Sequence, residues 1–192
     1  LMTWANDGLA RLWSAYSDKE RREMLDKRVC YPELGTSATK MRLIMMALNM
    51  GDRQNREKLF MNRPVGIDVE FEWNEQVVTN LLSRHLTAKD WEFVQNTWDF
   101  LNELWPQISS MHKELTGFSP PKVEAEPFNI FQPNGTMLTI RGGYFPLKED
   151  PRASLRASIR EQLDQPLYDE TNPAWIASTR TGHTKARTEA QY

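Results

Sequence analysis

The residues best suited to chemistry lie near the end of the chain, in a short basic segment. Arg180, Lys185 and Arg187 occur there with His183, with a glycine and hydroxyl side chains between them and no acidic residue among them. Guanidinium and ammonium groups beside a glycine and hydroxyls suit the oxygens of a phosphate. The segment therefore predicts a phosphate or nucleic-acid contact. An ordinary solvated arm explains the same residues, and we favour it.

A second candidate joins Arg141 to Tyr144 through two glycines. Glycine lets a ligand or another strand approach the backbone closely, and a tyrosine ring can stack on a nucleobase. Packing of this segment against a hairpin explains the same four residues. We favour that structural interpretation and keep the ligand contact as the alternative.

Metal and cofactor chemistry finds no comparable pattern. His85, His112 and His183 each stand without a second ligand at the spacing that zinc requires. A single cysteine, Cys30, forms no internal disulfide, and we expect it to be a small buried hydrophobic residue. No glycine-rich loop precedes a Lys with Ser or Thr, as a Walker-type phosphate site would require. We predict no catalytic residue, no metal and no cofactor.

The composition narrows the class of protein. Lys and Arg number 24 against 26 Asp and Glu, which gives a net charge of −2 over 192 residues. Proteins built to coat nucleic acid carry a strong basic excess, so this balance leaves room only for a local basic site. No apolar run approaches the roughly 18 residues that a membrane-spanning helix requires. We therefore expect no membrane span.

The element that organises the chain is a long helix over residues 87–115. Thr87 and Asp90 supply side-chain acceptors for its first N–H groups, and Gly117 provides the usual stop. Pro106 lies inside the helix and removes a hydrogen bond, which predicts a kink over residues 102–105. Apolar residues recur at three- and four-residue steps and form one stripe that requires a large surface to pack against: Trp91, Val94, Trp98, Leu101, Trp105, Ile108 and Leu115.

Three segments are expected along the chain. Residues 1–117 form a helical domain, because apolar residues recur there at helical spacing. Residues 118–150 are rich in proline and form an extended segment with a hairpin, which the Asn-Gly pair at 134–135 predicts. Residues 151–192 form a short amphipathic helix, over 155–163, and an irregular arm. The predicted fold is mainly α: a helical bundle around one long kinked helix, with a small β-hairpin appendage and an irregular C-terminal arm.

Six short motifs are spread over most of the chain, from Arg42 to Arg187. They are Asn49-Met50-Gly51 with Asn55, Trp91-x-Phe93-Val94-Gln95 with Trp98-Asp99, Leu104-Trp105-Pro106, Lys122-Val123-Glu124-Ala125, Gly142-Gly143-Tyr144-Phe145-Pro146, and Thr179-Arg180-x-Gly182-His183-Thr184-Lys185. Together they resemble a region of the very large polyvalent proteins of phages and prophages. Members of that group are multidomain chains, often carried in the virion and delivered with DNA into the host. The resemblance implies a phage or prophage origin and a piece of a longer chain, and it implies no reaction.

Part of the same order is similar to another family. Gly142-Gly143-Tyr144 and the basic segment from Arg180 to Lys185 follow a helical region and a proline-rich stretch, as in phage-type single-subunit RNA polymerases. The spacing is longer here, and the catalytic aspartates of those polymerases have no match. This similarity implies that the two motifs contact template or product and take no part in phosphoryl transfer.

These observations favour a non-catalytic structural or interaction region of a large phage- or prophage-encoded protein, delivered to or acting in the bacterial host. The expected partners are the rest of its own larger chain, other proteins and, in the alternative, nucleic acid. That alternative is an accessory region of a phage-type RNA polymerase or DNA-entry enzyme that contacts nucleic acid. The expected location is the virion, the bacterial cytoplasm or both. A free-standing enzyme is a third option.

Overall fold

The structure is a computed structural model that describes residues 2–61 and 72–146. In chain order it contains α1 (Met2–Trp13), α2 (Asp18–Asp26), β1 (Arg28–Tyr31), the 3-10 helix η1 (Pro32–Leu34), β2 (Thr36–Thr39), α3 (Lys40–Leu48), α4 (Arg53–Met61), α5 (Glu75–His85), α6 (Ala88–Asn102), α7 (Trp105–Thr116), β3 (Phe128–Phe131) and β4 (Met137–Ile140). The predicted class, mainly α with a small β-hairpin, is confirmed. The predicted helix over 155–163 and the predicted arm lie outside the described residues.

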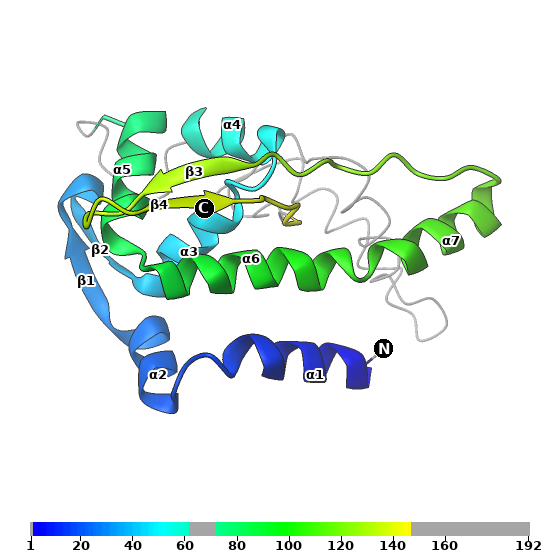
Figure 1. Cartoon of the computed structure of the whole chain (residues 1–192), viewed down its shortest axis with the longest axis horizontal. Helices are drawn as coiled ribbons and strands as arrows, with labels where there is room; N and C mark the ends of the chain where they lie inside the picture. Colours follow the sequence, from blue (N-terminus) through cyan, green and yellow to red (C-terminus); the bar gives the residue numbers. More distant parts are fainter. Residues whose placement is uncertain (1, 62–71, 147–192) are drawn as a thin grey trace, which may run out of the picture.

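Helix α6 is the axis around which the other elements are arranged. Figure 1 shows α1 along one side of α6 and the β3–β4 hairpin along the other, and both α1 and β4 contact α6. Helix α3 also packs on α6, and α5 contacts both α3 and β3. Helix α7 continues from the end of α6 and extends to one end of the molecule (Figure 1).

The long helix is bent where its proline predicts. Helix α6 ends at Asn102 and α7 begins at Trp105, so that Pro106 lies in the first turn of α7, where a missing N–H leaves no hydrogen bond unmade. Thr87 and Asp90 form a reciprocal capping box at the start of α6, and Gly117 closes α7 in the left-handed conformation with φ 78°. The predicted caps and the predicted kink are confirmed.

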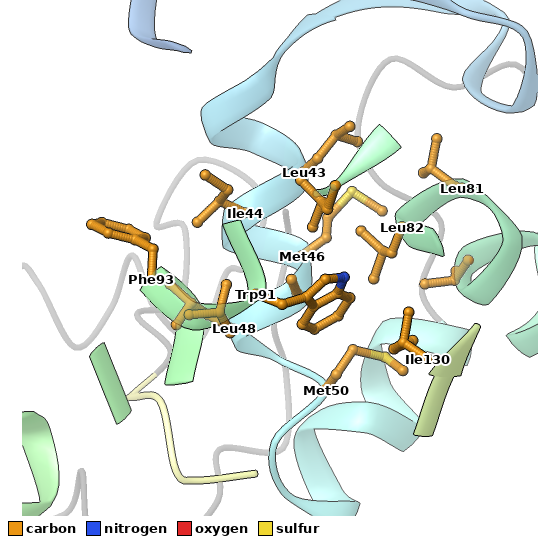
Figure 2. Packing of buried hydrophobic residues seen from close by; sticks show 14 of the residues in the cluster. Leu43, Ile44, Met46, Leu48, Met50, Leu81, Leu82, Trp91, Phe93 and Ile130 are labelled. Carbon is orange, nitrogen blue, oxygen red and sulfur yellow. The ribbon is translucent and has the colours of Figure 1, made fainter. Parts of the chain in front are cut away.

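The apolar stripe of the bent helix is buried only along α6. Trp91, Val94 and Trp98 are at most 2% exposed, whereas α7 contains no buried residue. Figure 2 shows Trp91 among apolar side chains of α3, α5 and β3; those labelled there include Leu43, Met46, Leu48, Leu82 and Ile130. The large surface that the sequence requires is therefore supplied by α3, α5 and the hairpin, and α7 lies beyond it.

The predicted hairpin is confirmed, and it also completes the core. Strands β3 and β4 pair antiparallel, with Ile130 opposite Leu138. Ile130 is 1% exposed and Ile140 is 6% exposed, so one face of the hairpin belongs to the hydrophobic core. Burial of alternate residues is the period-2 pattern of a strand with one solvated face. The hairpin is thus more closely integrated than an appendage.

A second hairpin, β1–β2, has no counterpart in the sequence-based prediction. Its strands join through η1 and Gly35, which adopts φ 61°. Tyr31 is buried and faces the core, whereas the adjacent Cys30 is exposed. The expectation of a buried cysteine is wrong, because successive residues of a strand point to opposite faces and Tyr31 takes the inner one.

A buried carboxylate ties three helical segments together. Asp90 is fully buried and accepts a hydrogen bond from the Tyr16 hydroxyl at 2.9 Å. Its other oxygen lies 2.7 Å from Nζ of Lys40 on α3 and accepts the backbone N–H of Thr87 at 2.8 Å. Burial, followed by the nearby Asp90 carboxylate, raises the pKa of Tyr16 above its usual value. The capping residue of α6 therefore also holds the end of α1 and the start of α3 in place.

We expect this arrangement to make stability depend on pH in alkaline solution. The pKa of Tyr16 in the folded state lies above the unfolded value of 10.0, so its contribution is complete below about pH 10 and is lost as pH rises further. Urea unfolding of the wild type should show a steeper loss of unfolding free energy above pH 10 than unfolding of Tyr16→Phe. Parallel curves for the two proteins would contradict this assignment.

Candidate functional site

Three of the sequence motifs meet in a pocket of about 220 Å³ beside α6. One wall is α6 with its C-terminal residue Asn102, the second is residues 122–125, and the third is residues 141–144, which follow β4. The side chains of Gln95, Trp98 and Asp99 belong to the α6 wall. Segments more than forty residues apart in the sequence are thus brought together at one place.

The base of the site is a crossing of backbone that we call the glycine junction, formed by Gly51, Gly142, Gly143 and Trp98. The Gly51 carbonyl accepts two backbone N–H groups, from Glu126 and from Gly143, both at 2.9 Å. A Cβ on Gly51 would lie 2.2 Å from the Gly143 carbonyl oxygen and 2.5 Å from the Trp98 ring, and a Cβ on Gly142 would lie 2.5 Å from the Gly51 oxygen. Only glycine allows the three segments to approach this closely.

Two side chains satisfy backbone carbonyls around the glycine junction. The Trp98 indole N–H donates to the Leu48 carbonyl at 3.0 Å, at the end of α3. The Asn55 amide donates to the Phe145 carbonyl at 2.9 Å and so fixes the chain after Tyr144 against α4. Both donors belong to motifs of the resemblance. Their role in the structure is to satisfy buried backbone groups, which would otherwise destabilise the fold by about 1–3 kcal/mol each.

Arg56 of α4 holds the extended segment that precedes β3. Its guanidinium donates to the carbonyls of Met50 at 2.9 Å and Glu126 at 2.8 Å, and it lies 3.5 Å from the Glu126 carboxylate. Its Cζ also lies 4.8 Å from the centre of the Phe128 ring. These contacts connect the α3–α4 corner to the segment on which Lys122 and Glu124 lie.

The mouth of the pocket has a balanced charge. Arg141 pairs with Asp99 at 2.5 Å, although both side chains are about half exposed or more, at 69% and 49%. Lys122 and Glu124 add one charge of each sign to the lining. An exposed pair of this kind contributes at most about 1 kcal/mol. Two bases matched by two acids do not make the positive groove that a phosphate backbone requires.

The Gln95 amide positions the segment that carries Arg141. Its oxygen accepts the Arg141 backbone N–H at 3.0 Å, and its nitrogen donates to the Gly142 carbonyl at 3.2 Å and to Asp99 at 3.1 Å. The lining contains no serine, threonine, cysteine or histidine. Within residues 2–61 and 72–146, no group of three His, Cys, Asp or Glu residues is placed to hold a metal ion. The pocket thus offers polar contacts without a nucleophile and base pair.

Beside the glycine junction, the α3–α4 corner buries three polar residues whose burial has no clear signal in the sequence. Asn49, Asp52 and Asn55 are at most 1% exposed. Asp52 caps α4 by accepting the Asn55 backbone N–H at 3.0 Å, and burial raises the pKa of its carboxyl group. One side-chain oxygen of each residue has no hydrogen-bond partner within the described part of the chain. The corner therefore keeps polar groups inside the core next to the motif residues.

The candidate residues from the sequence fall into two groups. Arg141 is exposed at the pocket mouth, and Tyr144 is 8% exposed in its lining. The basic residues Arg180, His183, Lys185 and Arg187 lie outside the described residues. Sequence reasoning did not select Gln95, Asp99 and Lys122 as site residues, although all three occur in motifs of the resemblance.

Two of the three histidines belong to the described structure. His85 lies 3.2 Å from the Glu33 carboxylate and against the Tyr31 ring. The Nδ1 atom of His112 lies 2.9 Å from the Phe118 carbonyl oxygen, at the end of α7. Each histidine therefore contacts its own local neighbours, and the two do not meet at the pocket.

Comparison with models of known families, with curated proteins and with solved structures found no match to this chain. The similarity to phage polyvalent proteins therefore stays an expectation from the motifs. Among residues 2–61 and 72–146, no helix combines the length and the apolar character needed to cross a membrane.

Gly51→Ala tests the glycine junction directly. The new methyl group meets a backbone oxygen and a packed indole, neither of which can move away cheaply, so we expect a loss of about 3 kcal/mol in unfolding free energy. Urea denaturation followed by circular dichroism measures it. Ser110→Ala on the exposed face of α7 is the control and should change stability by less than about 0.5 kcal/mol. Equal stability of the two variants would show that the segments do not meet at Gly51.

Proposed function

We propose that this chain is a non-catalytic structural and interaction region of a large phage- or prophage-encoded protein, acting in the virion, in the bacterial cytoplasm, or in both. The observation that carries the proposal is the meeting of four motifs around Gly51. Their polar groups bond to one another, as in the contacts of Trp98 with Leu48 and of Asn55 with Phe145. Residues used in this way hold the fold together, which fits a scaffold better than an active site.

The charged groups of the described residues support the same conclusion. Asp90 is paired with Lys40 and is used to join helices, and Arg56 is used to hold the segment before β3. An active site requires titratable groups that converge on a space where substrate fits. The pocket beside α6 instead presents matched exposed charges, with Arg141 beside Asp99.

The surface of α7 supports a role in interaction. Leu115 is 59% exposed and Phe118, just after the helix, is 77% exposed. Adjacent exposed apolar side chains of this kind mark contact sites for other protein segments. The expected partners are the rest of the larger chain and other phage or host proteins.

Localisation tests the proposed origin. After prophage induction in the source bacterium, peptides of this chain should co-purify with phage particles through a density gradient, as quantified by mass spectrometry. An abundant host cytoplasmic protein is the control for carry-over and should be depleted from the same fractions. Peptides that are absent from the particles, with a cellular amount unchanged by induction, would contradict the proposal.

A second candidate function is nucleic-acid contact, which the exposed Arg141 near Lys122 at the pocket favours. Under the structural proposal, the 192-residue chain should show no salt-dependent binding to DNA or RNA in fluorescence anisotropy at low salt. Under the alternative it should bind, and Arg180→Ala and Lys185→Ala should each weaken binding and reduce its salt dependence. Lys19→Ala, on the remote helix α2, is the matched control and should leave binding unchanged.

A further inference from the structure

The apolar stripe of the bent helix continues along α7 after the core has ended. Ile108, Met111 and Leu115 follow one another at three- and four-residue steps, and their exposure rises along the helix. Ile108 is half-buried, Met111 is 39% exposed and Leu115 is 59% exposed. A stripe of this spacing belongs to a helix that packs one face against another segment. We call these three residues the α7 stripe.

The described chain leaves the molecule next to α7. Asn102, the last residue of α6, and Tyr144 line the same pocket, and α7 begins three residues after Asn102. The segment beyond Pro146 therefore starts close to the N-terminal end of α7. Figure 1 shows the rest of α7 extending away from the core, beyond α6.

The next apolar pattern in the sequence lies within reach of this helix. Leu155, Ile159 and Leu163 recur at four-residue steps and give the amphipathic pattern predicted above, outside the described residues. The eight residues 147–154 can span up to about 29 Å. Helix α7 has 12 residues and is about 18 Å long. The connection is thus long enough to bring the second stripe onto the first.

We propose that the α7 stripe is an intramolecular docking surface for residues 155–163, with Leu155, Ile159 and Leu163 packed against it. The small size of the surface selects a tethered occupant over a second copy of the chain. A stable interface between proteins buries about 800 Å² on each partner, which these three side chains cannot supply. A tethered segment acts at an effective concentration of the order of millimolar and needs far less area. The inference does not depend on the proposed function.

Disulfide trapping in the full chain tests this contact. In a Cys30→Ser background, Leu115→Cys combined with Ile159→Cys should form an intramolecular disulfide under mild oxidation, because packed residues bring their Cα atoms within about 7 Å. Lys113→Cys with Ile159→Cys is the control, since Lys113 is an exposed residue outside the stripe. Met111→Cys in place of Leu115→Cys allows for a one-turn difference in register. Trapping at the stripe positions no greater than at the control overturns the proposal.

The oligomeric state distinguishes the two occupants. Size-exclusion chromatography should give a monomer, and the trapped disulfide should stay within one chain on a non-reducing gel. A disulfide-linked dimer at micromolar concentration would assign the stripe to a second copy and overturn the proposal.

Hydrogen exchange provides a measurement that needs no cysteine. Leu155→Ser combined with Ile159→Ser should speed amide exchange in residues 108–116 about tenfold and leave α6 unchanged, because the stripe loses its cover. Gln162→Ser is the control and should change neither helix. Equal exchange in the double variant and the wild type would show that α7 is covered by something else or by nothing.

Discussion

The Gly51 carbonyl is the point on which the rest of this structure depends. It accepts N–H groups from Glu126 and Gly143 under the Trp98 ring, so the α3–α4 corner, the extended segment and the exit of the β-hairpin all cross at one oxygen. A side chain at Gly51 would separate them. Because backbone groups buried in this way must be paired, the crossing fixes the hairpin against α6 and thereby closes the core.

A second fixed point lies at the other end of α6. Asp90 joins the start of this helix to α1 through Tyr16 and to α3 through Lys40. The two points hold α6 at both ends, and most of the described polar contacts between distant elements lie near one of them. Helix α7 lies outside this frame and contains no buried residue. Local opening costs least where buried contacts are fewest, so the molecule consists of a fixed body and a separately stabilised helix.

This division explains how conserved chemistry can be absent while specific motifs are present. Glycines, amides and indoles in the motifs are required by close packing and backbone pairing, as Gly51 and Trp98 demonstrate. The charges at the pocket mouth are matched and exposed, so they favour solubility and specificity of contact over a strong local field. A scaffold whose interactions are made by a projecting helix is consistent with all of these features.

The sequence by itself determined the features that arise within a few residues: the Thr87 cap, the bend before Pro106 and the Asn-Gly hairpin. Each depends on local backbone geometry and hydrogen bonds, which neighbouring residues specify. Tertiary structure alone decided that Cys30 faces solvent, that β1 pairs with β2, and that Gln95, Asp99 and Lys122 meet Arg141 at one pocket. Those outcomes depend on which distant segments pack together, and the spacing of residues within one segment does not contain that information.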